Sequence, residues 1–112
     1  MDTELGQDEQ PIKEGRANLM RGPEAVGGKL YLTNQRLIFE SHALNVQRGA
    51  EQVPLADVVE VGKVWTRVFG VLPLVPNSLA VTDGEGVVRR FVLNGRSGWA
   101  TAIEAARQPP PA

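Results

Sequence analysis

The sequence contains no cysteine and only one histidine, His42. Disulfides, cysteine-ligated zinc, iron–sulfur clusters and thiol nucleophiles are therefore excluded, and one imidazole cannot build a multi-histidine metal site. No apolar run approaches the roughly 18 residues that a membrane-spanning helix needs. The acidic N-terminus also lacks the basic and then apolar layout of a signal peptide. We therefore expect a cytoplasmic protein without a transmembrane segment, a metal site or a cofactor.

Aromatic residues are scarce, at 5% of the 112 residues, and no strongly basic stretch accompanies them. The 12 basic and 13 acidic residues leave a net charge of −1, whereas nucleic-acid binders carry dense basic patches and stacking aromatic residues. The charge is uneven, because five acidic residues and one lysine lie in residues 1–14, and the rest of the chain carries +3. The sequence thus argues against a nucleic-acid partner.

Length and composition fit one globular domain, since 42% of the residues are hydrophobic and 22% are charged. The polar residues 1–11 predict a disordered acidic leader. The proline-rich residues 108–112 predict a disordered tail. The folded domain is therefore expected to span residues 12–107.

Short runs of alternating apolar residues, separated by turn residues, fill most of this domain and predict an all-β sandwich or barrel. The clearest pair is a hairpin of residues 25–33 and 36–40, in which Leu30 and Leu32 share one face. Pro54 suits an edge strand, because proline cannot donate a ladder hydrogen bond. Further strands are expected over residues 12–20, 51–55, 58–64, 78–83 and 87–93.

The period changes near the C-terminal end of the domain, in residues 97–107. Trp99, Ala102, Ile103 and Ala106 recur at helical spacing and form one apolar stripe. We predict an amphipathic helix that packs Trp99 and Ile103 onto an open end of the sandwich.

The stretch from Gly28 to Phe39, GKLYLTNQRLIF, closely resembles the central hairpin of GRAM domains. Residues 52–58 and 77–82 resemble later strands of the family, and Trp99 matches the helix position where pleckstrin-homology-like domains hold a tryptophan. The resemblance covers residues 14–106. It implies a mainly β, pleckstrin-homology-like fold: a bent β-sandwich or partly open barrel of about seven strands, capped by one C-terminal helix.

The same resemblance implies a non-catalytic binding module for anionic lipid headgroups or for proteins, and not an enzyme. The basic–any–Arg triplet of phosphoinositide-binding relatives is absent, because Leu30 and Tyr31 follow Lys29. The residues themselves show no catalytic pattern, since the carboxylates are scattered and His42 has no recognisable nucleophile beside it. The favoured interpretation of His42 is a loop histidine that bonds to the backbone. The expected location is cytoplasmic, and peripheral at a membrane surface if a lipid is the ligand.

The candidates for headgroup binding are four basic residues on or beside the first three strands: Arg16, Arg21, Lys29 and Arg36. Such a group can hold an anion by charge-assisted hydrogen bonds. The favoured alternative is a solvated surface in which these residues pair with Glu14, Glu24 and Glu40, since exposed ion pairs are common and weak. The uneven charge adds the hypothesis that the acidic leader shields this basic face.

Residues 62–77 are mostly apolar but are interrupted by Gly70, Pro73 and Pro76, and three interpretations stay open. The segment is a core-packed strand, an exposed tip that enters the membrane surface, or a patch that docks a protein or a second copy of the chain. An edge strand near residues 51–55 is a further place for a partner to bind. The membrane or partner contact candidates are Lys63, Trp65, Arg67, Phe69, Leu72 and Leu74.

Overall fold

The computed structural model describes residues 1–21, 24–42, 51–66 and 75–107, without the side chains of residues 63–66 and 75–77. In chain order the elements are β1 (Pro11–Arg21), β2 (Glu24–Thr33), β3 (Arg36–Ser41), β4 (Glu51–Pro54), the 3-10 turn η1 (Leu55–Asp57), β5 (Val58–Thr66), β6 (Val75–Asp83), β7 (Val88–Leu93) and α1 (Arg96–Arg107). These elements confirm the strands and the C-terminal helix that the sequence predicts.

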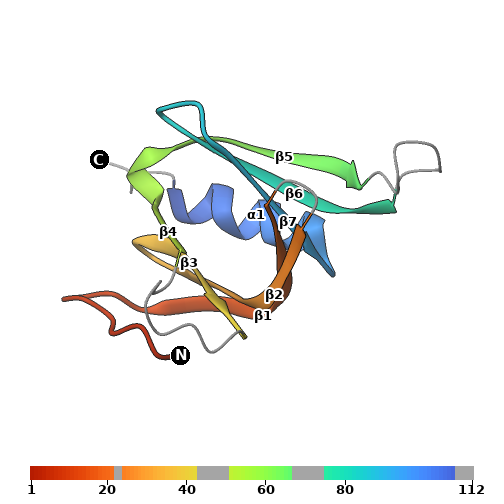
Figure 1. Ribbon diagram of the computed structural model, residues 1–112. Helices are drawn as coiled ribbons and strands as arrows, with labels where there is room; N and C mark the ends of the chain where they lie inside the picture. Colours follow the sequence, from red (N-terminus) through yellow and green to blue (C-terminus); the bar gives the residue numbers. More distant parts are fainter. Residues whose placement is uncertain (22–23, 43–50, 67–74, 108–112) are drawn as a thin grey trace.

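The seven strands that the described residues form make one sheet in the order β4-β3-β2-β1-β7-β6-β5. Neighbouring strands are antiparallel, and β1 pairs with both β2 and β7. Figure 1 shows the sheet bent into two layers, with β1, β2 and β3 in one layer and β5 and β6 in the other. The sheet is not closed into a barrel, since β4 and β5 stand at its two ends. This confirms the expected pleckstrin-homology-like architecture.

The inner side of the bent sheet carries the main hydrophobic core. Because side chains alternate along a strand, Leu30 and Leu32 of β2 point inward together with Leu37 and Phe39 of β3. The ring of Phe91 from β7 lies 5.9 Å from the ring of Phe39, so side chains of the two layers meet in this core. We call this the inner side and the opposite side of the sheet the outer face.

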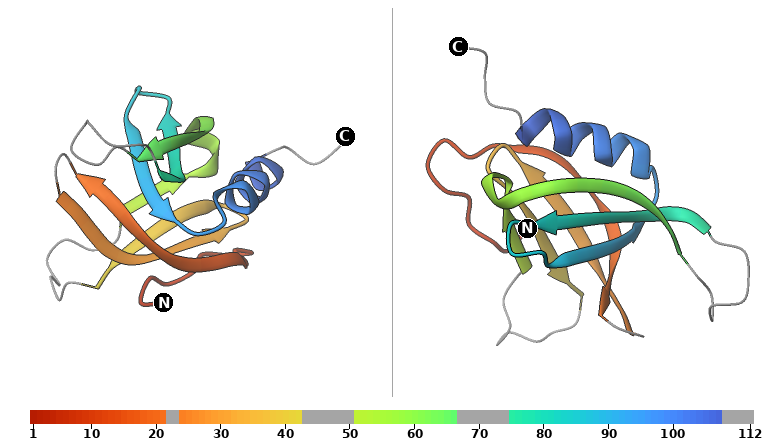
Figure 2. Two further views of the ribbon diagram at one scale, coloured as in Figure 1. Left: turned by 90° about the vertical axis from the view of Figure 1, so that its right-hand side faces the viewer. Right: turned by 90° about the horizontal axis from the view of Figure 1, so that it is seen from above.

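Helix α1 lies at one opening between the two layers (Figure 2) and contacts β5, β6 and η1. Its apolar stripe points into the core, where Trp99 and Ile103 are buried. A Cβ atom added to Gly15 would lie 3.5 Å from the Trp99 ring, and the Lys13 ammonium lies 5.3 Å from the centre of that ring. The predicted packing of Trp99 and Ile103 is confirmed.

The pairing of β2 with β3 requires a glycine at position 28. Gly28 lies opposite Ser41 in the ladder, and a Cβ atom there would collide with the backbone oxygen of Glu40 and come within 2.8 Å of the Phe39 ring. Any larger residue would push β3 away from β2. The hairpin that the sequence predicts most clearly therefore depends on this close backbone approach.

Residues 1–10, which we call the strap, belong to the stretch that the sequence analysis expects to be an acidic leader. Figure 1 shows the strap along the side of the β1–β3 layer that faces away from α1. It is bonded to the β2–β3 hairpin, and Glu9 is buried there. Pro11, which the expected leader included, is the first residue of β1.

Candidate functional site

The four basic residues proposed for headgroup binding do not form one cluster in the structure. Arg16 and Lys29 are directly opposite each other in the β1–β2 ladder, on the outer face. Lys29 lies 3.4 Å from the Glu14 carboxylate, in an exposed ion pair, and 5.9 Å from the centre of the Tyr31 ring. Arg16 is exposed and has no hydrogen-bond or ion-pair partner among the residues that the structure describes.

Arg21 lies at the end of β1 and belongs to a network of charges. Its guanidinium is 3.7 Å from the Glu51 carboxylate, which also accepts a 2.8 Å hydrogen bond from Arg89. Arg89 donates a second bond, of 2.9 Å, to Asp83, and this bond lowers the pKa of the Asp83 carboxyl. Because Glu51 belongs to β4 and Arg89 to β7, the network ties the two layers together. Arg21 is thus partnered by a carboxylate already.

Arg36 is still more fully occupied. Its guanidinium donates to both carboxylate oxygens of Glu9, at 2.8 and 3.0 Å, and a further bond of 2.6 Å reaches Gln52. The Glu9 side chain is 1% exposed, and its carboxylate also accepts a 2.6 Å bond from the Thr33 hydroxyl. The hydrogen bonds from Arg36 hold the pKa of Glu9 at about 2, against the opposing effect of burial. The acidic strap therefore holds Arg36, while no residue of the described ranges pairs with Arg16.

Arg90 is a basic residue that the sequence analysis did not single out. It lies opposite Met20 in the β1–β7 pairing, is exposed, and has no partner within the described part of the chain. Two residues away on the same face of β7, Val88 is 50% exposed. A signal was available in the sequence, because an inward Phe91 requires its neighbour Arg90 to point outward. Arg90 thus shares the outer face with Arg16 and Lys29, although its ladder partner Met20 lies four residues along β1 from Arg16, and we call these three residues the basic patch.

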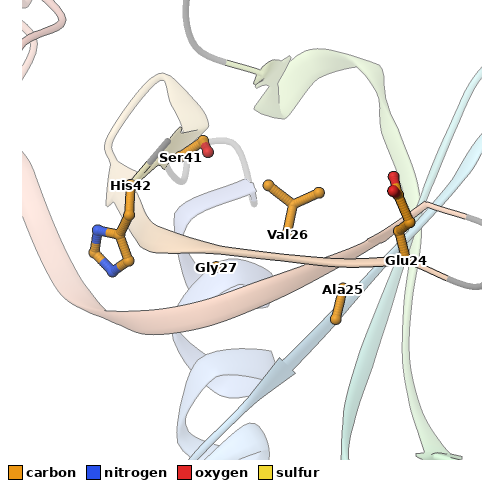
Figure 3. Close-up of a pocket in the computed structure, with 6 residues that line it drawn as sticks. All are labelled: Glu24, Ala25, Val26, Gly27, Ser41 and His42. Atoms are coloured by element: carbon orange, nitrogen blue, oxygen red, sulfur yellow. The ribbon is translucent and has the colours of Figure 1, made fainter. Parts of the chain in front are cut away.

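A cavity of about 400 Å³ lies at the ends of β2 and β3. Figure 3 shows its lining, with the Glu24 carboxylate and the His42 ring at opposite ends of the view and Val26 between them. Its described lining has one carboxylate and no lysine or arginine, so the lining offers little to an anionic headgroup. The backbone N–H of His42 donates to the Gly27 oxygen at 2.9 Å.

None of the contacts above tests the residues of the apolar segment that the sequence analysis proposes for membrane or partner contact. Lys63 and Trp65 lie on strand β5, but their side chains are not among those described. Arg67, Phe69, Leu72 and Leu74 lie outside the described residues. The three interpretations of this segment stay predictions.

Two absences apply to the described residues only. Among them, no group of three or more histidine and carboxylate side chains is placed to hold a metal ion. None of the helices they form has the length and apolar character to cross a membrane.

The model of the GRAM domain family matches residues 1–80 of the sequence. The chain belongs to the GRAM domain family. The match includes the hairpin from which the resemblance was inferred, and it extends through β4 and β5 into β6. None of the curated proteins searched matches this GRAM domain.

Solved structures, PH domains among them, superpose on this GRAM domain. The Vps36 N-terminal PH domain matches with a TM-score of 0.71 at 17% identity, over 93% of this chain and 83% of that one. The C-terminal domain of an unknown protein from Leishmania infantum also gives a TM-score of 0.71, at 13% identity, over 88% and 84% of the two chains. A DH/PH fragment of PDZRHOGEF, solved in complex with human RhoA, gives 0.65 at 13% identity over 88% of this chain and 29% of that one. At these identities the likeness shows the fold alone.

GRAM and pleckstrin-homology-like domains are typically non-catalytic binding modules. Family and fold therefore suggest that this domain binds a membrane or a protein. The binding module expected from the sequence agrees with this general role, which names no specific lipid or protein partner.

Proposed function

We propose that this GRAM domain binds anionic lipid headgroups at a membrane surface through the basic patch. The observation that carries the proposal is that Arg16 and Arg90 are exposed and unpaired within the described structure, on the same outer face. A cation already held by a buried carboxylate must lose that bond before it can bind a phosphate, whereas an unpaired cation keeps only its water. Arg36 is disfavoured as a headgroup ligand for this reason, because Glu9 is buried. Arg21 is less strongly disfavoured, since its ion pair with Glu51 spans 3.7 Å between partly exposed side chains.

The basic patch predicts weak and reversible binding. Each lysine or arginine close to an anionic membrane contributes about 1 kcal/mol, so three residues provide a modest affinity. The exposed Val88 and the half-buried Met20 beside Arg90 add apolar surface for contact with the membrane interface. Phe69 to Leu74 stay further candidates for contact with the acyl boundary. Such binding would make the domain a peripheral membrane protein.

The experiment is co-sedimentation with vesicles of phosphatidylcholine alone or mixed with phosphatidylserine, at about 50 and about 150 mM salt. We expect binding to the mixed vesicles only, weakening at higher salt because surface charges are screened over about 8 Å at physiological ionic strength. The double variant Arg16→Gln/Arg90→Gln should lose most of the binding.

The matched control is Lys13→Gln, which removes one positive charge from the same strand on the inner side, beside Trp99. This variant should bind nearly as well as the wild type. Equal binding to both kinds of vesicle, or an unchanged affinity of the double variant, would contradict the proposal.

Protein binding at a sheet edge is the second candidate. The edge strands are β4, as the sequence predicts, and β5, where Val59 is 56% exposed. An exposed edge offers unpaired backbone groups to an added strand. Val59→Lys should then reduce self-association in sedimentation velocity without lowering the melting temperature. If the wild type is a monomer at all concentrations tested, self-association at this edge is excluded.

A further inference from the structure

The β2–β3 turn forms a carboxylate-binding site from its own residues. The backbone N–H groups of Gln35 and Arg36 each donate to the Thr33 hydroxyl oxygen at 3.0 Å, which orients the hydroxyl proton toward Glu9. Thr33 is fully buried, and the Arg36 guanidinium stands beside it. The hairpin itself therefore positions the Thr33 hydroxyl and the Arg36 guanidinium. These donors could bind any carboxylate that reaches the position of the Glu9 carboxylate.

The same turn binds the backbone of the strap without regard to its side chains. Asn34 donates from its amide to the Asp8 oxygen at 3.0 Å, and Gln35 donates to the Gln7 oxygen at 2.8 Å. A third donor, Arg36, reaches the Glu4 oxygen at 2.8 Å. Main-chain recognition of this kind accepts many sequences.

The strap also crosses an apolar part of the outer face. Ile38 and Tyr31 are paired across β2 and β3, and both are buried although they point away from the main core. Arg36 and Glu40 flank Ile38 on this face, and both hold the strap: Glu40 accepts bonds of 2.7 Å from the backbone N–H and the hydroxyl of Thr3. The outward face of a half-solvated strand is normally polar, so buried isoleucine and tyrosine here indicate a surface built to be covered.

We propose that this surface is a docking site for an acidic segment of a partner protein, and that the strap occupies it in cis. The strap presents its carboxylate from a turn, in which the Glu9 N–H donates to the Gly6 oxygen and the Gly6 N–H donates to the Glu9 carboxylate. We call it the strap site; its residues are Tyr31, Thr33, Asn34, Gln35, Arg36, Ile38 and Glu40. The partner's carboxylate takes the place of Glu9 between Arg36 and Thr33, and its backbone takes the place of residues 4–8. The strap itself shows the chemistry of the occupant: one placed carboxylate on a chain held by main-chain bonds. The basic patch plays no part in this, so the inference is independent of lipid binding.

The strap competes with such a partner for the strap site and lowers the partner's apparent affinity. A segment tethered by a short linker competes at an effective concentration in the millimolar range. A partner peptide of ordinary affinity therefore binds poorly until the strap loosens. Glu9→Ala loosens the strap in the full chain and leaves the donors of the hairpin intact.

The test uses a synthetic peptide of residues 1–10, added to the full-length Glu9→Ala variant. Binding is followed by the backbone amide shifts of Gln35, Arg36 and Ile38 in NMR spectra. We expect saturable shifts at these three amides. A control peptide with Glu9→Gln should bind at least about tenfold more weakly, since it loses the charge-assisted hydrogen bonds. The wild-type chain should need at least about tenfold more of the acidic peptide than the variant does.

Two results would overturn the proposal: equal binding of the two peptides, or no shift at the three amides in the variant. If Glu9→Ala does not fold, the full chain with Glu9→Gln replaces it, because glutamine keeps the shape of the side chain. The Arg16→Gln/Arg90→Gln variant separates this site from the basic patch. A triple variant that combines Arg16→Gln and Arg90→Gln with Glu9→Ala should bind the acidic peptide with the same affinity as Glu9→Ala alone. This should hold even if the triple variant no longer binds vesicles.

Discussion

The outer face of this one sheet has two neighbouring halves that differ in what covers them. Over β2 and β3, the strap lies on the sheet, and Thr33 and Ile38 are buried beneath its contacts. Over β1 and β7, Arg16 and Arg90 stand exposed without a partner among the described residues. Arg36 and Arg16 are both outer-face arginines within one layer, yet of the two only Arg16 lacks a partner in the described part of the chain. The availability of a cation for a ligand is thus decided by which carboxylate the fold brings to it.

The ion pairs of the two halves differ in strength as well as in solvent exposure. The bond between Arg36 and Glu9 uses two nitrogen–oxygen pairs and a nearly inaccessible carboxylate. The pair between Lys29 and Glu14 is a single contact of 3.4 Å between exposed side chains. A buried, bidentate pair loses much when one member is removed, whereas an exposed pair contributes about 0–1 kcal/mol.

The largest expected effect comes from the inner side, because both halves rest on one core. Trp99→Ala removes a buried indole that packs over Gly15. We expect a loss of about 3–5 kcal/mol in the free energy of unfolding, enough to unfold a domain of this size or bring it close to unfolding. Urea denaturation followed at amides of both halves measures it. An unchanged stability, or loss of one half alone, would show that the halves do not share this core.

The second-largest effect on stability is expected from Glu9→Gln, which tests the difference between the ion pairs of the two halves. Glu9→Gln removes the charge between Arg36 and Thr33, and we expect it to lower the free energy of unfolding by about 1.5–3 kcal/mol. The matched control is Glu14→Gln, which makes the same chemical change in the exposed pair and should cost less than about 1 kcal/mol. Thermal and urea unfolding of the two variants give the comparison. Equal losses would mean that the strap adds no more stability than a surface ion pair.

The strap pair also predicts a dependence on pH. The pKa of Glu9 is lowered from 4.5 to about 2 in the folded state, chiefly by its hydrogen bonds from Arg36. A lowered pKa contributes stability that is complete above pH 4.5 and is lost as the pH falls toward 2. The stability difference between wild type and Glu9→Gln should therefore shrink across this range in urea titrations at successive pH values. A difference that stays constant down to pH about 2.5 would show that the Glu9 carboxylate is not held as an anion.

The fold could be predicted from the sequence because its signals are local. The alternation around Leu30 and Leu32 gives the central hairpin, and the change of period at Trp99 gives the helix. Both signals arise from whether a side chain faces the core, which neighbouring residues already reveal.

The candidate site could be predicted only in part, because its pairing is not local. Sequence placed Arg16, Lys29 and Arg36 on the first strands, but it could not show that Arg36 is bonded to a residue 27 positions away. Glu9 lies in a polar stretch without periodicity, so nothing nearby marks it as buried. Arg89 and Arg90 are a different case: the strand period sends the first inward to Glu51 and the second outward.

The smallest effect on stability is expected in the open half, where the functional effect is expected to be large. Arg16→Gln and Arg90→Gln each remove an exposed guanidinium with no described partner, so each should change the free energy of unfolding by less than about 0.5 kcal/mol. A substitution that reduces vesicle binding but leaves stability nearly unchanged marks a ligand-binding residue. Arg36→Gln should instead lower the stability and leave vesicle binding nearly unchanged. Denaturation and vesicle co-sedimentation on the same three variants test this. If Arg16→Gln destabilises the domain as much as Arg36→Gln, the distinction between an open and a covered half fails.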